Sequence, residues 1–355
     1  MTLEELRKSI DQIDNELLLL LNKRMEVVKK VGELKRNENT VIYRPEREKA
    51  IIDRLNRLSN GTLRRSAIEA IFMEVFAISR NLEYPERIAY LGPEGSFTHQ
   101  AAESRYGAMS EYLPLSTIEA VFEAVQSERA RFGVVPLENN QEGIVTETID
   151  YLGSYDLNIV AEIPISISFV FASICENLQD IRRVYSKDIA FRQCKRFLDN
   201  TFNRSSIELV PVSSTSHAVE KALQDDQGAA ICSQIAARMQ QLPVLFQHVE
   251  DSPDNFTRFL IISKDFINQR STNDKTTILA KTPDKPGSLV MLLQDFYDAE
   301  INLTKIESRP AKSGKNFKYW FYIDLEGHYE DENIQKVMRK HAKEIKWLGS
   351  YVKLC

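Results

Sequence analysis

The sequence predicts a multidomain protein with an all-helical N-terminal segment, an α/β middle segment and an α+β C-terminal segment. Apolar residues recur at three- and four-residue steps over residues 1–84, which is the period of a helix. Short apolar strands then alternate with helical stretches over residues 87–265. After a polar linker, Asn268–Asp274, the pattern becomes strand, helix, two strands and helix. A length of 355 residues fits two or three domains.

Composition and charge favour a globular protein and argue against general nucleic-acid binding. Hydrophobic residues make up 43% of the chain and charged residues 27%, which leaves ample material for a core. The formal net charge is −5, so only a local basic pocket would attract a small anion. No apolar run reaches the ~18 residues that span a bilayer, and the first residues resemble no signal or transit peptide. We therefore expect the protein in the cytoplasm.

The four cysteines predict neither a disulfide framework nor a metal site. Cys175, Cys194, Cys232 and Cys355 lie far apart, and no two of them form a C-x-x-C pair. Each is expected to be a small buried hydrophobe or an incidental thiol. No metal site is indicated.

The first helix is expected to run from Leu3 to about Arg36. Thr2 can cap it, and Glu5 can complete a capping box. At 1.5 Å per residue the helix is roughly 50 Å long, too long for a domain of this size to cover within one chain. A homodimer or higher homo-oligomer in which two long helices pack together would cover it. Two further helices are expected at Pro45–Ser59 and Leu63–Leu82, and Pro85 closes the segment.

Strand signals begin after this segment. A strand at Arg87–Leu91 is followed by the turn Gly92–Gly95 and a helix from about Thr98. Further strands are expected at Phe132–Leu137, Leu157–Ile163, Ser166–Ala172 and Ala229–Cys232. Strands that alternate with helices predict α/β layers and a mostly parallel sheet.

The C-terminal segment is expected to have the order βαββα, closed by a last strand. Its elements are expected at Thr276–Lys281, Ser288–Ala299, Ile301–Arg309, Lys318–Leu325, Glu332–His341 and Tyr351–Leu354. This order is typical of a ferredoxin-like module.

The basic residues of the first helix have an unusual spacing for a purely structural helix. Arg24 and Lys35 are eleven residues apart, which places them within ~20° of one face and about 16 Å apart along the axis. Arg7 lies about 100° off that face, so it could not easily serve the same pocket. In an antiparallel dimer, the partner's Arg7 could. The ordinary alternative is a solvated charged surface.

An ordered set of short motifs in residues 1–84 resembles the helical chorismate mutase family. The motifs are Leu6-Arg7-x-x-Ile10-Asp11-x-Ile13-Asp14, Arg24, Gly32-x-x-Lys35, Pro45-x-Arg47-Glu48 and Ser79-x-x-Leu82-Glu83. The resemblance implies a cationic grip on the two carboxylates and the ether oxygen of chorismate, made by Arg24, Lys35, Arg47 and the partner's Arg7. It also implies that Glu48 holds the substrate hydroxyl, and that the third helix contributes Ser79 and Glu83.

The rearrangement of chorismate to prephenate suits these residue types. It is one pericyclic step, so the enzyme holds a folded conformer and stabilises negative charge that grows on the ether oxygen. Lys35 suits that point charge, and arginine suits bidentate carboxylate binding. Two positions depart from relatives: Arg44 stands where many carry an acid, and Glu83 where some carry glutamine. Glu83 can donate a hydrogen bond to the ether oxygen only as a carboxylic acid.

Polar clusters at strand ends in the middle segment resemble prephenate dehydratase over residues 87–265. The clusters are Tyr90-Leu91-Gly92-Pro93-Glu94-Gly95-Ser96-Phe97-Thr98, Val135-Pro136-Leu137-Glu138-Asn139 and Asn255-Phe256-Thr257-Arg258-Phe259. Polar residues at the ends of α/β strands are where ligands normally lie. The first cluster is not G-x-G-x-x-G, so a nicotinamide site is poorly supported.

The resemblance implies two α/β lobes around a cleft, as in periplasmic binding proteins. It implies that Thr257 is the key catalytic hydroxyl, with cleft residues Asn139, Ser186 and Gln193 that position or polarise substrate. Substrate-binding residues would be Ser96, Phe97, Thr98, Glu138 and Arg258; a structural role suits Glu138 and Arg258 equally well. Departures from the usual family residues are Asn140 and Lys187-Asp188.

Prephenate would lose carbon dioxide and its hydroxyl together, driven by aromatisation, so no cofactor is expected. Thr257 is a weak acid, and its expected role is a hydrogen bond to the leaving hydroxyl.

Residues 275–355 resemble the ACT domain that is fused to prephenate dehydratases. The matching segments are Pro286-Gly287-Ser288-Leu289-Val290 and Glu307-Ser308-Arg309-Pro310. The resemblance implies that phenylalanine binds between paired subunits at Gly287, Ser288, Leu289, Val290, Glu307, Ser308, Arg309 and Pro310, and lowers dehydratase activity. Pro286-Gly287 forms a turn that lets the backbone approach a ligand. An ordinary strand–turn–helix is the alternative.

These observations predict a bifunctional enzyme of phenylalanine biosynthesis with domains at 1–84, 87–265 and 275–355. It would convert chorismate to prephenate and prephenate to phenylpyruvate, with phenylalanine as feedback inhibitor and no nucleic-acid or membrane partner. Three alternatives remain: an amino-acid-sensing binding protein with only mutase activity, a fusion to prephenate dehydrogenase, and a preference for arogenate. The missing dinucleotide motif argues against the dehydrogenase.

Overall fold

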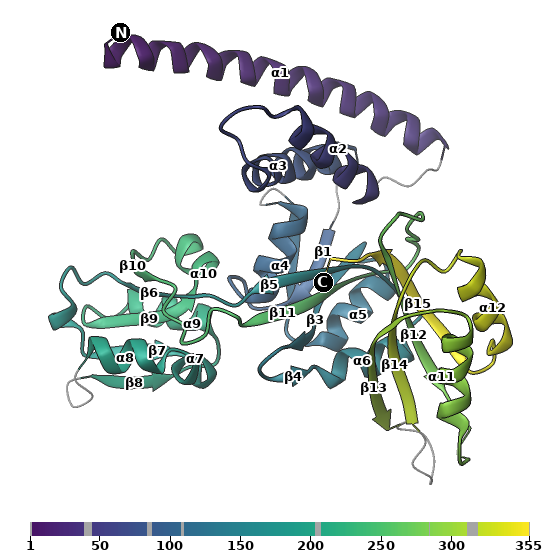
Figure 1. The fold of residues 1–355 in the computed structure, drawn as a ribbon. Coiled ribbons are helices and arrows are strands. Elements are labelled where there is room, and N and C mark those ends of the chain that lie inside the picture. Colours follow the sequence, from purple (N-terminus) through teal and green to yellow (C-terminus); the bar gives the residue numbers. More distant parts are fainter. Residues whose placement is uncertain are drawn as a thin grey trace. The chain divides into compact units, whose positions relative to one another are not determined.

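The computed structural model describes residues 2–38, 45–83, 87–107, 110–202, 207–283, 285–310 and 319–354. The chain divides into two compact units (Figure 1). One contains residues 1–86 and 105–111, and the other contains residues 87–104 and 112–355. Arg44, one of the departures noted in the sequence, lies outside the described residues.

Three helices form most of the first unit: α1 (Leu3–Glu38), α2 (Pro45–Leu58) and α3 (Arg65–Glu83). The expected capping box is present, because the backbone N–H of Thr2 donates to Glu5 and that of Glu5 donates to Thr2 Oγ1. Gly32 lies where α1 meets α3. A Cβ at this position would lie 2.9 Å from the Cα of Glu83, so glycine permits the close approach of the two helices.

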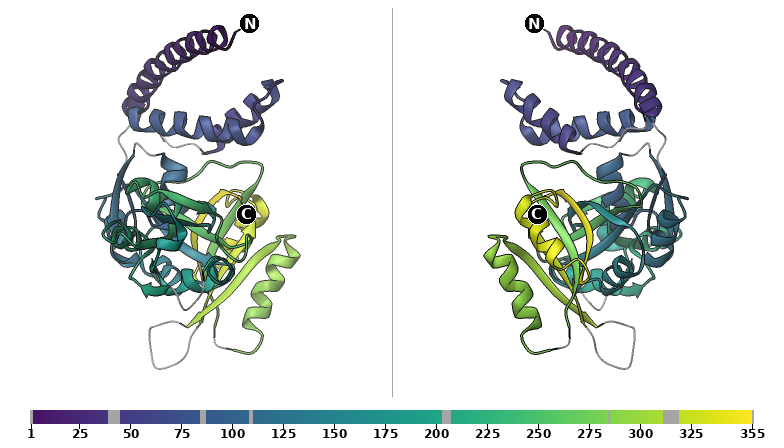
Figure 2. Two further views of the ribbon diagram at one scale, coloured as in Figure 1. Left: turned by 90° about the vertical axis from the view of Figure 1, so that its left-hand side faces the viewer. Right: turned by 90° about the vertical axis from the view of Figure 1, so that its right-hand side faces the viewer.

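One chain leaves the apolar face of α1 uncovered. Figure 2 shows that its N-terminal half projects away from α2 and α3. Val28 is the one buried apolar side chain of α1 within the described residues. The exposed ones are Leu3, Leu6, Ile10, Ile13, Leu17, Leu18, Leu19, Leu20, Val27, Val31 and Leu34. An apolar stripe of this length marks a contact surface.

The middle segment has two lobes, each built on one sheet. The first lobe has the strand order β2-β1-β3-β11-β5, with β4 beside β3. Its strands are β1 (Arg87–Leu91), β2 (Glu111–Leu115), β3 (Phe132–Asn139), β4 (Gly143–Ile144), β5 (Asn158–Ser166) and β11 (Phe256–Ser263). Its helices are α4 (Phe97–Tyr106), α5 (Ile118–Gln126) and α6 (Thr146–Ser154).

The second lobe has the strand order β10-β6-β9-β7-β8. Its strands are β6 (Phe169–Ser173), β7 (Arg183–Ser186), β8 (Glu208–Pro211), β9 (Gly228–Ser233) and β10 (Val244–Gln247). Its helices are the short 3₁₀ turn η1 (Leu178–Asp180), α7 (Asp188–Gln193), α8 (Lys195–Thr201), α9 (Thr215–Leu223) and α10 (Gln234–Met239).

The prediction of a mostly parallel sheet was wrong. β1 and β3 are parallel, as are β7 and its two neighbours, but β11 runs antiparallel to both β3 and β5. The chain leaves the first lobe after β5 and returns into β11, so the returning strand enters against the direction of its neighbours. The backbone N–H of Ile167 donates to the carbonyl of Asn255 at 2.7 Å, which pairs the outgoing and returning segments.

The C-terminal sheet is antiparallel, with the order β13-β14-β12-β15. Its strands are β12 (Asp274–Lys281), β13 (Leu303–Pro310), β14 (Tyr319–Glu326) and β15 (Ile345–Val352), and its helices are α11 (Ser288–Asp298) and α12 (Glu332–Lys340). β15 begins earlier than expected. The reason is a turn in which the N–H groups of Glu344 and Ile345 both donate to the carbonyl of His341, and the strand starts directly after it.

Each face of the C-terminal sheet is covered. One face packs on α11 and α12 through a core that contains Ile278, Phe296 and Ile323. The opposite face supplies Leu279, Tyr322, Leu348 and Tyr351 to the core of the first lobe. The two parts therefore share one hydrophobic core.

The polar stretch before β12 is fixed in place. The side-chain amide of Asn268 is buried and donates to the carbonyls of Val160 and Ser350, at 2.8 and 2.9 Å. It therefore ties β5 to β15. Within the described ranges, no helix has both the length and the apolar character that a membrane span requires.

Candidate active sites

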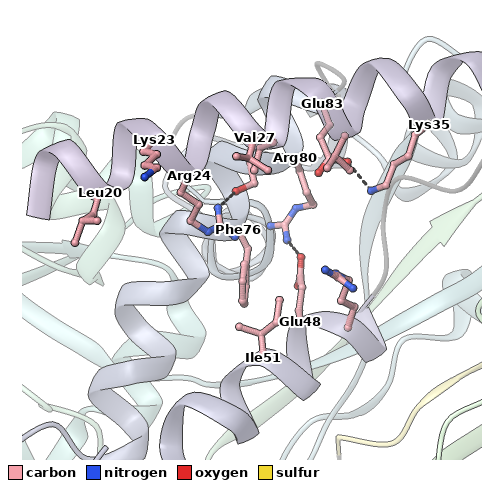
Figure 3. Close-up of a pocket in the computed structure, with 14 residues that line it drawn as sticks. Leu20, Lys23, Arg24, Val27, Lys35, Glu48, Ile51, Phe76, Arg80 and Glu83 are labelled. Carbon is pink, nitrogen blue, oxygen red and sulfur yellow. Dashed lines mark hydrogen bonds and ion pairs between the residues drawn. The ribbon is translucent and has the colours of Figure 1, made fainter. Parts of the chain in front are cut away.

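A pocket of about 860 Å³ lies between α1, α2 and α3 (Figure 3). Its polar lining residues include six of those predicted from the sequence: Arg24, Lys35, Arg47, Glu48, Ser79 and Glu83. Its apolar lining residues are Leu20, Val27, Val28, Val31, Ile51 and Phe76. The pocket is therefore cationic at several points and apolar between them, which suits a small dianion that has a hydrocarbon ring.

Acceptors on α3 position two cations of α1. Arg24 Nη1 donates to Ser79 Oγ at 2.5 Å, and Lys35 Nζ donates to Glu83 Oε2 at 2.6 Å (Figure 3). Burial lowers the pKa of Arg24, and the negative charge of Glu83 opposes this effect. The two cations point into the pocket from one face of α1, as their eleven-residue spacing predicted.

Arg7 does not line the pocket of its own chain. It lies on the exposed N-terminal part of α1. This position agrees with the rotation of about 100° that separates Arg7 from the face of Arg24 and Lys35.

Arg80 is a pocket residue that the sequence reasoning missed. It is 5% exposed, and its guanidinium donates to the Glu48 carboxylate and, at 2.5 Å, to the carbonyl of Arg105. Its guanidinium carbon lies 5.7 Å from the Tyr106 ring centroid, within range of a cation–π contact. Arg105 Nη1 lies 3.7 Å from the other oxygen of Glu48. The spacing of Arg80 and Glu83, at i and i+3 on α3, is the signal that could have found it.

Thr257 and Asn139 meet on adjacent strands of the first lobe. They are register partners on β11 and β3. Asn139 Nδ2 donates to Thr257 Oγ1 at 2.9 Å and to Asn255 Oδ1 at 2.7 Å. Asn139 Oδ1 accepts from the N–H groups of Gln141 and Glu142, which fixes the orientation of the amide. Thr257 oxygen is therefore an acceptor from Asn139, and its O–H can donate to a ligand.

The loop after Asn139 is held by Asn140. Its backbone N–H donates to the carbonyl of Phe256, and its side-chain oxygen accepts from the Phe256 N–H, each at 3.0 Å. Its side-chain amide also donates to the carbonyl of Asp254. This departure from the usual family residue therefore fixes the loop next to Thr257.

The two predicted site residues of the second lobe have different environments. Gln193, at the end of α7, donates to Gln141 in the loop after β3 at 3.5 Å, so it faces the first lobe. Ser186 is fully buried, and its hydroxyl donates to the carbonyl of Ile231 at 2.6 Å. Gln193 therefore lies on the side of the second lobe that faces the loop after Asn139. The Ser186 hydroxyl is instead bonded within the second lobe.

The loop before α4 makes structural contacts. Ser96 Oγ accepts from the N–H of His99 and donates to the carbonyl of Leu91, each at 3.2 Å, so it caps the helix. Phe97 packs edge-on against Phe169, with ring centroids 5.4 Å apart. Thr98 is buried. Substrate binding by Ser96, Phe97 or Thr98 stays a prediction.

Arg258 is directed away from Thr257, toward the C-terminal sheet. Its Nη2 donates to Asp324 Oδ2 at 2.7 Å and to the hydroxyl of Tyr322 at 3.2 Å. Burial acts to lower the pKa of Arg258, but Tyr322, Asp324 and other acidic neighbours outweigh it and raise the pKa. These contacts favour the structural alternative for Arg258 that the sequence left open.

Two family models match the chain. The chorismate mutase type II model matches residues 6–84, and the prephenate dehydratase model matches residues 88–266. The bifunctional chorismate mutase/prephenate dehydratase of Aquifex aeolicus is 41% identical over 99% of this chain and 98% of its own length. The chain belongs to the bifunctional chorismate mutase/prephenate dehydratase family.

Other comparisons agree with this assignment. The bifunctional chorismate mutase/prephenate dehydratase of Pseudomonas aeruginosa is 36% identical over 99% of this chain and 98% of its own length. A solved structure of prephenate dehydratase from Arthrobacter aurescens, in complex with L-Phe, has a TM-score of 0.68 and 33% identity. The matched region spans 75% of this chain and 90% of the Arthrobacter aurescens chain. As a member of the family, this protein is an enzyme whose mutase segment holds the helical pocket and whose dehydratase segment holds Thr257.

The predicted effector residues of the chorismate mutase/prephenate dehydratase occupy two places beside the C-terminal sheet. Gly287 is the N-cap of α11, with φ of 83°, a left-handed conformation that favours glycine. Ser288, Leu289 and Val290 form the first turn of α11. Residues Glu307–Pro310 end β13, where the guanidinium of Arg309 contacts Asp150 at 3.3 Å.

Proposed function

We propose that the chain converts chorismate to prephenate in the helical pocket and prephenate to phenylpyruvate at Thr257, and that phenylalanine inhibits the second reaction through the C-terminal segment. Two observations support this proposal: Arg24, Lys35, Arg47, Glu48, Ser79 and Glu83 line one pocket, and Asn139 is hydrogen-bonded to Thr257 on the adjacent strand. The domain boundaries that we propose are 1–84, 87–265 and 275–355.

In the mutase pocket, charge and shape supply the catalysis. Arg24 and Arg47 bind the carboxylates of chorismate, while Lys35 faces the ether oxygen as negative charge develops there. Glu48 accepts a hydrogen bond from the substrate hydroxyl. Its pairing with Arg80 and Arg105 holds the carboxylate in one orientation before substrate arrives.

The mutase pocket needs a second chain. A homodimer that packs two α1 helices together would cover the exposed leucines of α1 and bring the partner's Arg7 to the pocket. The uncovered apolar face and the absence of Arg7 from the pocket of its own chain support this arrangement.

In the dehydratase reaction, Thr257 donates a hydrogen bond to the hydroxyl that leaves. The carbon–carbon bond to the ring carboxylate breaks, its electron pair completes the aromatic ring, and the carbon–oxygen bond breaks at the same time. The departing hydroxyl takes up one proton and leaves as water. The Asn139 amide supports this role because it donates a hydrogen bond to the Thr257 oxygen. The Thr257 hydroxyl therefore does not donate to Asn139, and its proton is available for the substrate.

The C-terminal segment resembles a ferredoxin-like regulatory module. The strand order β13-β14-β12-β15, with two helices on one face, supports this comparison. Among the residues that the structure describes, chain neighbours aside, none lies within 4 Å of where a Cβ on the left-handed N-cap Gly287 would be, which supports close approach of a ligand to the backbone. The Arthrobacter aurescens prephenate dehydratase was solved in complex with L-Phe, and it covers 75% of this chain.

The proposal is tested by supplying chorismate and following prephenate and phenylpyruvate separately, with and without phenylalanine. We expect both products without added cofactor. We also expect phenylalanine to lower phenylpyruvate formation because it binds one conformational state of the protein more tightly than the other, by about 1–3 kcal/mol. Arogenate is offered in parallel to test substrate preference. Formation of prephenate alone would instead support the mutase-only sensor.

Replacing Glu83 with glutamine is expected to raise the mutase kcat/KM for chorismate. The Glu83 carboxylate forms an ion pair with Lys35 and only accepts hydrogen bonds, whereas the glutamine amide can also donate one to the ether oxygen. The measurement is kcat/KM for chorismate at one pH, with the exposed Glu33→Gln as the matched control. A kcat/KM for Glu83→Gln at or below that of wild type would contradict the idea.

A further inference from the structure

Two adjacent residue pairs on β3 and β11 face opposite sides of the first sheet. Thr257 pairs with Asn139, and Arg258 pairs with Glu138. Successive side chains of a strand point to opposite faces, so the first pair and the second pair have different neighbours. The register shifts directly after Arg258, and such irregularities re-aim side chains next to active sites.

The charged pair is joined to the C-terminal sheet. Lys305 of β13 forms an ion pair with Glu138, and Arg258 Nε lies 3.4 Å from the other oxygen of Glu138. Arg258 reaches Asp324 of β14 at 2.7 Å. The Asp324 side chain is fully buried, and its second oxygen accepts from Thr277 Oγ1 at 2.7 Å. A continuous series of charged contacts therefore connects β13 and β14 with β3 and β11, the strands that hold Asn139 and Thr257.

A second buried ion pair fixes the same interface. Lys275 donates two hydrogen bonds to Glu162 at 2.8 and 3.0 Å, and Arg258 Nη1 lies 3.7 Å from Glu162. The side chain of Lys275 is 3% exposed and that of Glu162 fully buried. Removing one partner of such a pair is costly because the remaining charge stays buried. The interface therefore favours one geometry.

β13 also carries the predicted effector segment. The less exposed face of this strand carries every second residue, among them Lys305, Glu307 and Arg309. Lys305 contacts Glu138 next to Asn139, and Arg309 contacts Asp150 on α6. A shift of β13 would therefore reach the first lobe through charged contacts close to the reacting hydroxyl.

We propose that Glu138 and Arg258 are positioning residues that fix the Asn139–Thr257 pair through their contacts with Lys305 and Asp324. This inference rests on the dehydratase activity proposed above. The link acts on the placement of Thr257, so it changes kcat; it does not touch prephenate, so it leaves substrate affinity intact. A displacement of about 1 Å in catalytic geometry can lower a rate by about 100-fold.

The test compares Lys305→Met with Lys264→Met in the full chain. The two lysines are similar, since their side chains are 22% and 34% exposed and each pairs with a glutamate. We expect Lys305→Met to lower the dehydratase kcat by about 10-fold and to keep KM for prephenate within about twofold. Lys264→Met should keep both values. Lys305→Arg should recover most of the lost kcat because it restores the ion pair.

A double-variant cycle decides whether the contacts act as one link. Lys305→Met combined with Glu138→Gln should be no slower than Glu138→Gln alone, because both substitutions break the same link. The thermal unfolding midpoint of each variant serves as a check on folding, because the mutase pocket lies in the other unit. An unchanged kcat in Lys305→Met, a rise in KM alone, or additive losses in the double variant would each overturn the inference. Failure of the proposed function would appear as no turnover of prephenate by the unaltered protein, whereas failure of this inference leaves that turnover intact.

Discussion

Thr257→Ala is expected to lower dehydratase kcat by at least about 100-fold, because the alanine cannot donate a hydrogen bond to the leaving hydroxyl. The Asn139 amide would also lose its 2.9 Å hydrogen bond to the Thr257 oxygen. Prephenate formation from chorismate should be unchanged, because Thr257 lies in a different unit from the helical pocket. The measurement is the rate of phenylpyruvate formation from prephenate beside the rate of chorismate loss.

Thr257→Ser is the matched control for this prediction. Serine keeps the hydroxyl and loses only a methyl group, so it should retain most of the dehydratase activity. If the alanine variant lost both activities together, the assignment of one reaction to each unit would be wrong. If serine were as slow as alanine, the hydroxyl would not be the group that matters.

Arg7→Ala and Lys35→Met are each expected to lower mutase kcat/KM by at least about 100-fold, since each removes a charge that stabilises the transition state. A mixed dimer, in which one chain carries Arg7→Ala and the other carries Lys35→Met, shows in which pocket Arg7 acts. If Arg7 serves the partner's pocket, one pocket of this dimer has both substitutions and the other has neither. With random pairing, about a quarter of all pockets would be intact, so mixing should restore about a quarter of the wild-type activity.

The mixed sample is prepared by co-expression of two differently tagged chains. Recovery of activity requires a dimer, and it requires that Arg7 and Lys35 of one chain serve different pockets. No recovery would mean that both residues act in the pocket of their own chain, contrary to the exposed position of Arg7 on α1. The Lys35→Met chain mixed with wild type serves as the control for tag effects.

The helices of the first unit could be predicted from the sequence almost to the residue. Their signals are local, because Thr2, Pro45 and the apolar repeat act within one or two turns. Strand direction could not be predicted in this way. The antiparallel entry of β11 depends on where the chain travels between Ser166 and Phe256, and no local pattern records that path.

The sites show the same limit at the level of single side chains. The motif residues of the mutase pocket were predicted, but Arg80 was missed because an arginine on a helix is ordinarily a solvated charge. Its meaning depends on Glu48, which lies on another helix. For Arg258, alternation along β11 predicts a face opposite to Thr257, but only the fold shows that Asp324 covers that face.

The core that the C-terminal sheet shares with the first lobe has an evolutionary consequence. Leu279, Tyr322, Leu348 and Tyr351 are part of the apolar interior on which the dehydratase strands rest. Loss of this segment would expose that interior to water, at a cost of about 25 cal/mol for each Å² of apolar surface. If phenylalanine inhibits the enzyme as proposed, release from inhibition is expected from single substitutions at the predicted effector residues, whereas truncation is expected to remove dehydratase catalysis along with regulation.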